Sequence, residues 1–295
     1  MFVVALKELD LNEYEKYLEV WLKGIRSELG YWRRFMEMKK PEKYGWTSSE
    51  RKCDFEQYLE YRKETICIDI GSGPFSSSGD KTDKTKLHFT AVDPLAYSYK
   101  ALKRKYNITA GINPDYCMVE RLTEKFKENT FDIVYMKNAL DHAFNPLLGI
   151  IQMMAICKKN GKIILQHRMN VAEKENFHGF HQWNLCVENS DFIIWRQNYK
   201  YNISKMLNQY AEIIIENAQE DWISIVLIKK KDIEINTELQ NSLTTILNEK
   251  IFEKLLEYAV SETYSTKENV ISIINKTPVL GNIAQKIYRK CRRLV

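Results

Sequence analysis

The sequence predicts an α/β fold, in which helices cover a mostly parallel sheet whose last two strands form an antiparallel hairpin. Two observations support this prediction. Between residues 64 and 231, short apolar stretches alternate with stretches of helical periodicity, which is typical of a parallel sheet. On either side of this region the pattern is helical only. We therefore expect a helical N-terminal cap over residues 1–63, a core over 64–231 and a helical C-terminal extension over 232–295.

The cap is expected to begin with a long amphipathic helix. From Leu11 to Met36, apolar residues recur every three or four positions, so they share one face of a helix. This helix is expected to end before Pro41, because proline disfavours helical backbone in the residue that precedes it. A second, short helix is predicted from Ser49 to about Arg62.

The core is expected to contain four parallel strands, two helices and the final hairpin. The strands are predicted at residues 66–70, 87–92, 131–135 and 162–166, the helices near 96–106 and 146–158, and the hairpin strands at 211–215 and 222–228. Asn160 and Gly161 are expected to close the second helix. Only six residues separate the last two strands, which is too few for a crossover helix. This spacing predicts a hairpin at the edge of the sheet.

Positive charge is concentrated at the end of the chain. The 295 residues carry a net charge of +5, yet residues 276–295 alone hold six basic side chains and no acidic one. The rest of the chain is nearly neutral, which argues against nucleic acid as a partner. In residues 281–295, basic side chains surround an apolar stripe, so we expect an amphipathic helix that contacts an anionic membrane surface or an acidic partner. The alternative is a solvated helix docked on the protein's own core.

The composition excludes several classes of protein. No apolar run approaches the roughly 20 residues that a membrane-spanning helix needs, and the start of the chain lacks the basic region of a signal peptide. The six cysteines include no CxxC pair, so neither a disulfide framework nor a thiolate zinc site is expected. We expect a cytoplasmic protein, either free or peripheral at the inner face of the membrane.

A glycine-rich loop after the first predicted strand indicates a nucleoside-binding crevice. In the segment Asp69-Ile-Gly71-Ser-Gly73-Pro74, two glycines allow a tight turn and a close approach of the backbone to a ligand. Asp93 ends the next strand, 22 residues after Gly71, where an acid can accept hydrogen bonds from two ribose hydroxyls.

A dinucleotide such as NAD is the rival ligand for this crevice, and two details disfavour it. Ser76 stands where the dinucleotide fingerprint has its third glycine, and Asp69 would repel a pyrophosphate. S-Adenosylmethionine carries an adenosine, an ammonium and a sulfonium but no phosphate, so it suits an acidic loop.

With these motifs the chain resembles the class I S-adenosylmethionine-dependent methyltransferases over about residues 64–231. The segment 69–74 is similar to the family's first motif and Val92-Asp93-Pro94 to its second. Phe131-Asp132 resembles the start of the fourth strand, and Lys159-Asn-Gly161 the turn before the fifth. The resemblance implies a Rossmann-like, seven-stranded methyltransferase sheet, S-adenosylmethionine as the methyl donor and S-adenosylhomocysteine as the product.

The resemblance also implies which residues hold the donor. Its methionine part is expected against the glycines, its ammonium near Asp69 and its ribose at Asp93. Met118 stands where many relatives have an aspartate for adenine, which leaves adenine to the backbone and Glu120. The full set of expected donor-binding residues is Asp69, Gly71, Gly73, Asp93, Pro94, Val119, Glu120 and Asn138.

Four of the five histidines lie within 40 residues of one another. His142 follows the fourth predicted strand, His167 the fifth, and His178 and His181 come next. Ligands of such sheets bind beyond the carboxyl ends of the strands, so we expect these imidazoles on the face that holds the donor. For each single histidine, the alternative is a hydrogen bond to backbone.

Methyl transfer to a hydroxyl requires that the acceptor is aligned and that its proton is removed. Histidine is suited to removing the proton, because it titrates near neutral pH. The expected catalytic residues are His181, His167, His142 and Asp141, with His181 as the first choice for the base and His167 as the second. A metal bound by Asp141, His142 and His167 is an alternative. We expect that no metal is required.

A narrower resemblance, to bacterial methyltransferases of capsule and surface-glycan biosynthesis, lies in residues 138–142 and 173–185. It implies O-methylation of a sugar, or of a substituent such as a phosphoramidate, on a polysaccharide or its nucleotide-activated precursor. Amide side chains are expected to bond hydroxyls and a tryptophan to stack on a sugar face, with a structural tryptophan as the alternative. The expected acceptor-binding residues are His178, Gln182, Trp183, Asn184 and Trp32.

Two other functions stay open at this point. One is an NAD(P)-dependent oxidoreductase that uses the same crevice, and the other is a non-catalytic, methyltransferase-like scaffold in a glycan-assembly complex. Donor binding distinguishes the first from a methyltransferase, and the effect of replacing His167 and His181 distinguishes the second. Methylation of nucleic acid is disfavoured, because the chain has no Asn-Pro-Pro-Tyr motif.

Overall fold

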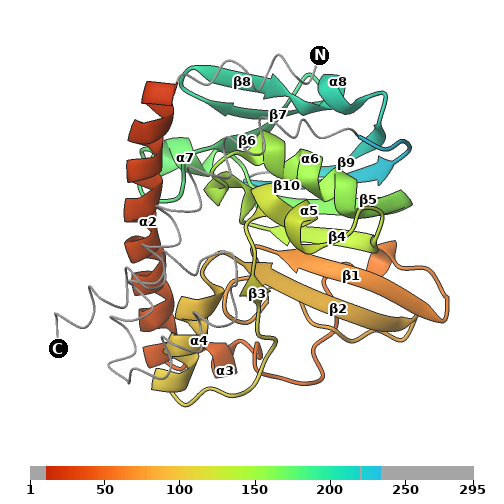
Figure 1. Ribbon diagram of the computed structural model, residues 1–295. Coiled ribbons are helices and arrows are strands. Elements are labelled where there is room, and N and C mark those ends of the chain that lie inside the picture. Colours follow the sequence, from red (N-terminus) through yellow and green to blue (C-terminus); the bar gives the residue numbers. More distant parts are fainter. Residues whose placement is uncertain (1–10, 77, 220, 234–295) are drawn as a thin grey trace.

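The computed structural model describes residues 11–76, 78–219 and 221–233, and its centre is a seven-stranded sheet with the order β3-β2-β1-β4-β5-β10-β9 (Figure 1). Its strands are β1 (Glu64–Ile70), β2 (Lys86–Asp93), β3 (Asp115–Tyr116), β4 (Phe131–Lys137), β5 (Cys157–Arg168), β9 (Ala211–Gln219) and β10 (Trp222–Lys229). Strands β1 to β5 pair in parallel, whereas β10 is antiparallel to both β5 and β9. The predicted α/β fold, with its mostly parallel sheet and antiparallel last hairpin, is confirmed.

Helices and short turns connect these strands. The helices are α2 (Leu11–Glu37), α3 (Lys40–Lys43), α4 (Ala96–Lys105), α5 (Leu122–Lys125), α6 (Pro146–Ile156), α7 (Val171–Lys174) and α8 (Ile203–Leu207), and the 3-10 turns are η1 (Glu56–Tyr58), η2 (Val119–Arg121) and η3 (Leu140–His142). The predicted long first helix is confirmed as α2. It ends before Pro41, which stands in the first turn of α3, where a missing N–H costs nothing.

Two local predictions are wrong. Residues 49–62 form no α-helix, and η1 is their only helical turn, because Phe55 and Tyr58 pack as irregular chain on the sheet, in one buried cluster with Tyr135. Asn160 does not close α6 either, since the helix ends at Ile156 and β5 begins at the next residue. Asn160 lies inside β5 with a φ of 63°, in the left-handed region.

A second, three-stranded antiparallel sheet, which was not predicted from the sequence, is inserted between β5 and β9. It consists of β6 (Asn184–Glu188), β7 (Asp191–Arg196) and β8 (Tyr199–Asn202). Asn189 and Ser190 connect β6 to β7 with φ values of 49° and 64°, as a two-residue type I′ hairpin requires. This Asn-Ser pair between apolar stretches was the available sequence signal.

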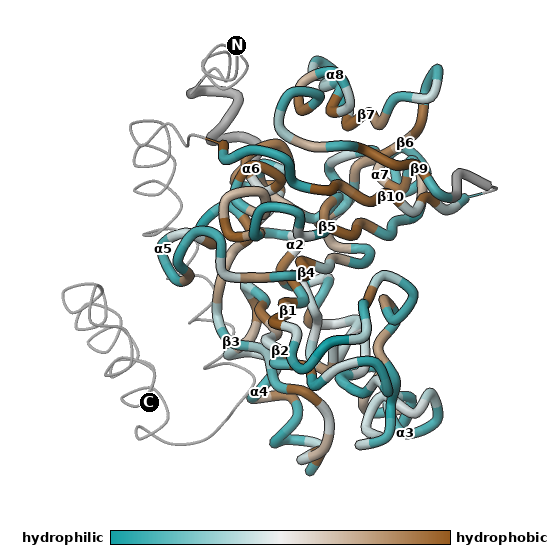
Figure 2. Tube along the Cα trace, turned by 90° about the vertical axis from the view of Figure 1, so that its right-hand side faces the viewer, coloured by the Kyte–Doolittle hydropathy of each residue, from teal (hydrophilic) through white to brown (hydrophobic). Residues whose placement is uncertain are grey.

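The helix α6 lies between the two sheets (Figure 1). All eleven of its residues are buried, as expected of a helix that is covered on every side. Its side chains share one core with residues of both sheets, among them Ile163 and Leu165 on β5 and Phe192 on β7. Figure 2 shows the hydrophobic stretches of β1, β5 and β10 that form the centre of this core. The insertion therefore completes the core of the main domain.

The helix α2 runs past the carboxyl ends of the parallel strands (Figure 1). Its residues Trp21, Ile25 and Leu29 share a buried cluster with Tyr99 of α4 and with Phe180. The contact with the loop around Phe180 depends on Gly24. A Cβ at Gly24 would lie 2.5 Å from Phe180 Cδ1 and 2.8 Å from its backbone nitrogen. Helix α2 thus forms a wall in front of the strand ends.

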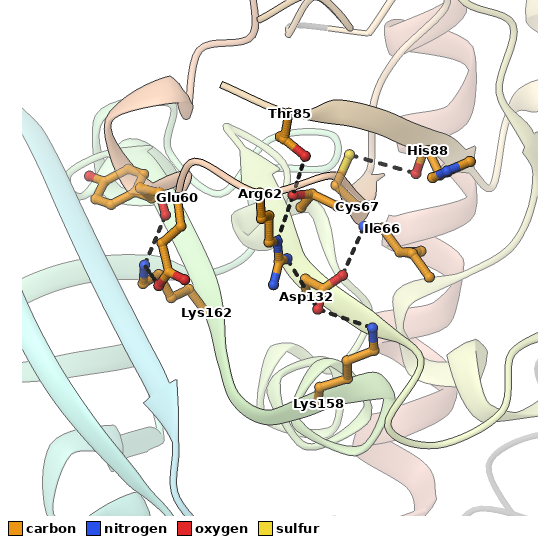
Figure 3. Close-up of polar contacts among 11 residues, drawn as sticks. Glu60, Arg62, Ile66, Cys67, Thr85, His88, Asp132, Lys158 and Lys162 are labelled. Carbon is orange, nitrogen blue, oxygen red and sulfur yellow. Dashed lines mark hydrogen bonds and ion pairs between the residues drawn. The ribbon is translucent and has the colours of Figure 1, made fainter. Parts of the chain in front are cut away.

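At the amino end of the sheet, Asp132 connects several segments (Figure 3). Its Oδ2 accepts the N–H of Ile66 at 2.8 Å, and its Oδ1 lies 3.0 Å from Lys158 Nζ and 3.2 Å from Arg62 Nη2. Burial raises the pKa of Asp132, but the Ile66 N–H and Lys158 outweigh it, so the pKa falls below its usual value. The starts of β1, β4 and β5 are therefore joined through one carboxylate.

No helix in the described ranges is long and apolar enough to cross a membrane. The predicted C-terminal extension from residue 234 onward, including the basic segment 281–295, lies outside the described residues. The same holds for residues 1–10 of the cap.

Candidate active site

A cavity of about 810 Å³ lies between α2 and the carboxyl ends of the strands. The loops after β1, β2 and β4, the helix α2 and the segment before β6 contribute its walls. Of the residues predicted from the sequence, the cavity is lined by Gly71, Gly73, Asp93, Pro94, Val119, Glu120, Asn138, Asp141, His142, His181 and Trp32. One cavity therefore brings together most of the predicted donor residues and three of the four predicted catalytic ones.

The loop after β1 turns sharply at two glycines. Gly71 and Gly73 each have a φ of 65°, where a side chain would strain the backbone. A Cβ on Gly71 would also lie 2.4 Å from Ala139 Cβ, and one on Gly73 would lie 3.1 Å from the ring of Trp32. The N–H of Gly71 donates to Val92 O at 2.9 Å, which joins the loop to the end of β2. Bare backbone at the cavity wall suits a ligand packed directly against it.

Asp93 is held rigidly at the cavity wall. Its Oδ2 accepts the N–H of Gly73 at 3.0 Å, and its Oδ1 accepts the N–H of Leu95 at 2.7 Å. Burial raises its pKa to about 7, although these two donors act in the opposite direction. Each carboxylate oxygen keeps further acceptor capacity. Asp93 is therefore placed to accept hydrogen bonds from two hydroxyls.

Asp69 is fully buried and does not line the cavity itself. Its Oδ2 accepts the hydroxyl of Ser76 at 2.5 Å, and Ser76 lines the cavity. Its Oδ1 has no hydrogen-bond partner among the described residues, and burial raises its pKa to about 7. A buried carboxylate oxygen without a partner fits a cationic ligand group, because pairing offsets the cost of desolvation.

Glu120 and Asn138 line the cavity and also bond to backbone. Glu120 Oε1 accepts the N–H of Asn145, the residue before α6, at 2.9 Å, and burial raises the pKa of Glu120. Asn138 Oδ1 accepts the N–H of Arg168 at 3.0 Å, which links the ends of β4 and β5. Val119, the chain neighbour of Glu120, lines the cavity as well, so an apolar side chain and a carboxyl group are both available here, which is compatible with adenine.

Asp141, His142 and His181 converge at the cavity wall. His181 Nδ1 lies 2.7 Å from Asp141 Oδ2 and 3.1 Å from His142 Nε2, and the third pair of atoms, His142 Nε2 and Asp141 Oδ2, is 3.5 Å apart. Asp141 and His142 belong to η3, directly after β4, whereas His181 comes from the segment before β6. The Asp141 side chain is buried, and both imidazoles are partly exposed.

The backbone of this cluster is fixed by its neighbours. Trp21 Nε1 on α2 donates to His142 O at 2.8 Å, and Gln182 N donates to Asp141 O at 3.3 Å. Burial raises the pKa of Asp141, but the two imidazoles outweigh it and lower the pKa to about 2. Burial lowers the pKa of His181, but Asp141 outweighs it and the pKa rises. The cluster therefore holds a carboxylate against a basic imidazole.

The other two of the four neighbouring histidines do not line the cavity. His167 on β5 is buried, and both of its ring nitrogens lack a hydrogen-bond partner among the described residues. Burial lowers its pKa to about 4, so the ring is neutral at physiological pH. His178 is exposed on the surface. Two imidazoles, rather than the predicted four, meet at the cavity.

Three predicted acceptor-binding residues are buried outside the set that lines the cavity. Gln182 Nε2 donates to two carbonyls of the loop 177–179, at 2.6 and 3.0 Å. Asn184 Oδ1 accepts the N–H of Glu173 at 3.0 Å. Trp183 is buried and packs against two tyrosines of the small sheet. In this structure their contacts brace the segment that carries His181.

The cavity also contains charged residues that were not predicted from the sequence, among them Glu28 and Arg51. Glu28 on α2 accepts a hydrogen bond from Trp32 Nε1 at 2.7 Å, and Arg51 Nη1 donates to Ser76 O at 3.0 Å. Neither belongs to a motif. The only signal for Glu28 is its position one helical turn before Trp32, beside the apolar face of the helix expected from Leu11 to Met36.

The fold and the site define a class I methyltransferase domain, with a glycine turn after β1, an acid at the end of β2 and an antiparallel hairpin that closes the sheet. The sequence model of a family described as a methyltransferase domain matches residues 68–165, from β1 to β5. The match covers 98 of the 295 residues, and it supports a methyltransferase domain of the S-adenosylmethionine-dependent class. No curated protein matches the sequence.

Several solved structures are similar to part of the chain. The CurJ carbon methyltransferase is 13% identical, with 59% of this chain and 51% of that chain covered and a TM-score of 0.40. The YcgJ protein from Bacillus subtilis is 14% identical, with 60% and 97% covered and a TM-score of 0.33. The 16S rRNA methyltransferase RsmC of T. thermophilus, solved with AdoMet and guanosine, is 7% identical, with 62% and 39% covered and a TM-score of 0.35. The chain spans about half the length of the CurJ and DszA carbon methyltransferases.

Proposed function

We propose that the protein uses S-adenosylmethionine to methylate an oxygen of a sugar, or of a sugar substituent such as a phosphoramidate, in the biosynthesis of bacterial capsule or surface polysaccharide. The observation that carries the proposal is that the His181–Asp141 pair lines the same cavity as Gly71, Gly73 and Asp93. A histidine paired with a carboxylate beside a methyl-donor site is suited to taking the proton of a hydroxyl.

The residues present fit the donor. The unpartnered Oδ1 of Asp69 suits its ammonium, Asp93 suits its ribose hydroxyls, and Val119 with Glu120 suits its adenine. When bound, S-adenosylmethionine supplies a methyl group that its sulfonium has already activated. A pyrophosphate would instead meet the carboxyl group of Asp93 in the cavity wall, so NAD(P)-dependent chemistry is not favoured.

In the proposed reaction His181 receives the proton of the acceptor. Its Nδ1 bonds to Asp141 Oδ2 at 2.7 Å, which leaves Nε2 for the acceptor hydroxyl. As the acceptor oxygen gains the methyl group, its proton moves to Nε2 and Asp141 stabilises the imidazolium. The products are a methyl ether or ester and S-adenosylhomocysteine. We assign this role to His181 rather than His167, because His167 does not line the cavity.

The rest of the cavity supports a sugar-like acceptor. Trp32, Trp46 and Phe180 contribute aromatic surface, on which the C–H face of a sugar packs well, and Glu28 and Arg168 contribute polar groups for hydroxyls or an anionic substituent. The assignment to capsule or surface polysaccharide rests on the resemblance of residues 138–142 and 173–185, which include the cluster of Asp141, His142 and His181.

An acceptor screen tests this proposal. Release of S-adenosylhomocysteine is measured over nucleotide sugars, phosphoramidates and capsule fragments, and we expect turnover with at least one of them. The variant His181→Ala should lose about 100-fold or more of the rate while its affinity for S-adenosylhomocysteine stays within about threefold of the wild type. The matched control is His88→Ala, an imidazole of β2 outside the cavity. Tight binding of NAD without binding of S-adenosylhomocysteine would refute the proposal, and no turnover of any acceptor would support the scaffold alternative.

A further inference from the structure

We infer that Asp141, His142 and His181 form a three-ligand site for a divalent first-row transition metal, which binds the acceptor hydroxyl at its remaining coordination positions. The inference rests on the proposed function. It specifies how the hydroxyl is held and made acidic, and it reverses our expectation from the sequence that no metal is required.

The spacing of the three side-chain atoms is that of ligands around one ion. Asp141 Oδ2, His142 Nε2 and His181 Nδ1 are separated by 2.7, 3.1 and 3.5 Å. Nitrogen and carboxylate ligands lie about 2.0–2.2 Å from such ions, so neighbouring ligands are about 3.0 Å apart in an octahedron and about 3.4 Å apart in a tetrahedron. One ion can therefore contact all three atoms after small side-chain adjustments.

Hydrogen bonds within the protein do not account for this convergence. An imidazole nitrogen carries either one hydrogen or one lone pair, directed in the plane of the ring. His181 Nδ1 nevertheless lies within hydrogen-bond distance of both Asp141 Oδ2 and His142 Nε2. It cannot make two full hydrogen bonds at once. A cation would accept a lone pair from each of the three atoms and resolve the competition.

The ligand atoms also indicate the class of metal. Two imidazole nitrogens and one carboxylate oxygen suit Mn²⁺, Fe²⁺, Co²⁺ or Zn²⁺, whereas Mg²⁺ and Ca²⁺ prefer oxygen ligands. Three protein ligands leave coordination positions open, as catalytic sites require. His142 and His181 both line the cavity, and their side chains are 22% and 34% exposed. The open positions of the metal would therefore face the space for the acceptor.

The surrounding protein holds the ligands in place. The hydrogen bonds from Trp21 Nε1 to His142 O and from Gln182 N to Asp141 O fix the backbone of two ligands. The rings of His142 and Phe180 lie 5.6 Å apart between centroids, and Phe180 precedes the third ligand. Hydrogen bonding and packing of this kind around the ligands are typical of sites that hold a metal with fixed geometry.

A metal at this position would acidify the acceptor. A bound dication lowers the pKa of water from about 16 to about 7, and it acts on an alcohol in the same direction. The hydroxyl proton leaves to solvent, and the acceptor oxygen then forms a bond to the methyl carbon. The bond between that carbon and sulfur breaks, with its electron pair remaining on sulfur. In this form of the reaction His181 is a metal ligand rather than the base.

Direct metal binding tests the inference. Co²⁺ is added to the tag-free, full-length protein after treatment with a chelator, and binding is followed by calorimetry and by visible absorption. We expect one equivalent to bind, and we expect Asp141→Asn, His142→Ala and His181→Ala each to weaken binding about tenfold or more. His88→Ala should bind Co²⁺ as the wild type does, and Mg²⁺ should bind far more weakly. Unchanged affinity for S-adenosylhomocysteine shows that a variant is folded.

The inference and the proposed function can fail separately. If the wild type binds Co²⁺ no more tightly than His181→Ala, the metal site is refuted, and turnover that survives the chelator then leaves His181 as the base. If Co²⁺ binds as expected but S-adenosylhomocysteine does not bind, the proposed function fails while the metal site stands. Added Mn²⁺, Co²⁺ or Zn²⁺ that restores lost turnover in chelator-treated wild type, but not in His142→Ala, supports both.

Discussion

At the scale of single residues, burial and neighbouring imidazoles together set the charge of the carboxyl groups at the cavity. Asp93 and Asp69 have pKa values raised to about 7, because little solvent reaches them, whereas the imidazoles around Asp141 lower its pKa to about 2. Three carboxyl groups, two in the cavity wall and one bonded to Ser76 of that wall, thus differ in charge at neutral pH. Two are poised to ionise when a ligand arrives, and the third is a permanent anion.

The raised pKa of Asp93 makes donor binding depend on pH. Ribose hydroxyls donate hydrogen bonds to the ionised carboxylate, so binding favours the charged form and releases a proton. Affinity for S-adenosylhomocysteine should rise with pH up to about 7 and level off above it. Calorimetry in buffers of different ionisation enthalpy measures both the affinity and the protons released. An affinity that does not change between pH 5.5 and 8, about 1.5 units below and 1 unit above the raised pKa, would contradict the role of Asp93.

Replacing Asp93 with Asn should reduce this pH dependence to the part that Asp69 contributes, and it should weaken donor binding about 10- to 100-fold, the effect of losing one or two charge-assisted hydrogen bonds. In the wild type the N–H groups of Gly73 and Leu95 each donate to one oxygen of the Asp93 carboxylate. In the variant, the NH₂ group of the amide would face one of these two donors. Glu64→Gln on the exposed start of β1, outside the cavity, is the control and should bind the donor as the wild type does. Equal affinities of Asp93→Asn and the wild type would count against the nucleoside site.

At the scale of secondary-structure elements, the site depends on how α2 meets the segment that carries His181. Gly24 allows this contact, since a Cβ there would lie 2.5 Å from Phe180 Cδ1. Trp21, one turn earlier, bonds to His142 O. Helix α2 therefore both covers the cavity and fixes one side of the cluster.

Gly24→Val should push α2 away from Phe180 and disturb the neighbouring cluster. We expect a loss of about 1–3 kcal/mol in the free energy of unfolding, as for overpacked cores, and a drop in turnover of at least tenfold. Gly30→Ala, on the same helix, is the control. Its Cβ would meet only Arg34 Nη1 at 3.8 Å, so it should stabilise the helix by about 0.5–1 kcal/mol. Urea unfolding and turnover measure the two effects; identical behaviour of both variants would contradict the close contact.

The start of the sheet offers a stability test that is independent of the site. Asp132→Asn removes the charge that binds Lys158 and Arg62 (Figure 3), and should cost about 1–2 kcal/mol at pH 7. The folded pKa of Asp132 is lowered, so its contribution is complete above the unfolded value of about 3.9 and is lost as pH falls through the folded value. The difference in unfolding free energy between variant and wild type should therefore shrink in acid. A difference that is constant from pH 7 to 3 would show that the charge is not involved.

At the scale of the whole molecule, a nearly neutral chain carries a basic end. Residues 276–295 contain six basic side chains, and the remainder of the chain sums to −1. We propose that the segment 281–295 brings the enzyme to the inner face of the membrane, where surface glycans are assembled. The acceptor is then presented at the surface on which the enzyme concentrates.

Neutralising this segment tests the proposal in the full-length chain. Replacing Lys286, Arg289, Lys290, Arg292 and Arg293 with Gln should reduce binding to vesicles that contain anionic lipid by about 100-fold or more, at about 1 kcal/mol per charge near the surface. Turnover of a soluble acceptor should not change. Co-sedimentation with anionic and with neutral vesicles measures the effect. Equal binding of both proteins to anionic vesicles would refute a membrane role.

The sequence by itself determined the features that depend on residues close together in the chain. The turn at Gly71 and Gly73, the acid at the end of β2 and the antiparallel hairpin follow from local backbone preferences and from short connections, so their patterns were sufficient. The failed helix at residues 49–62 shows the limit of local patterns, because packing of Phe55 and Tyr58 on the sheet overrode helical periodicity. Only the tertiary structure decided which histidines meet, since Asp141 and His181 stand 40 residues apart and are brought to 2.7 Å by the folding of β4, β6 and α2 around one cavity. Chemistry that needs three converging atoms is a property of packing, and no pattern along the chain encodes it.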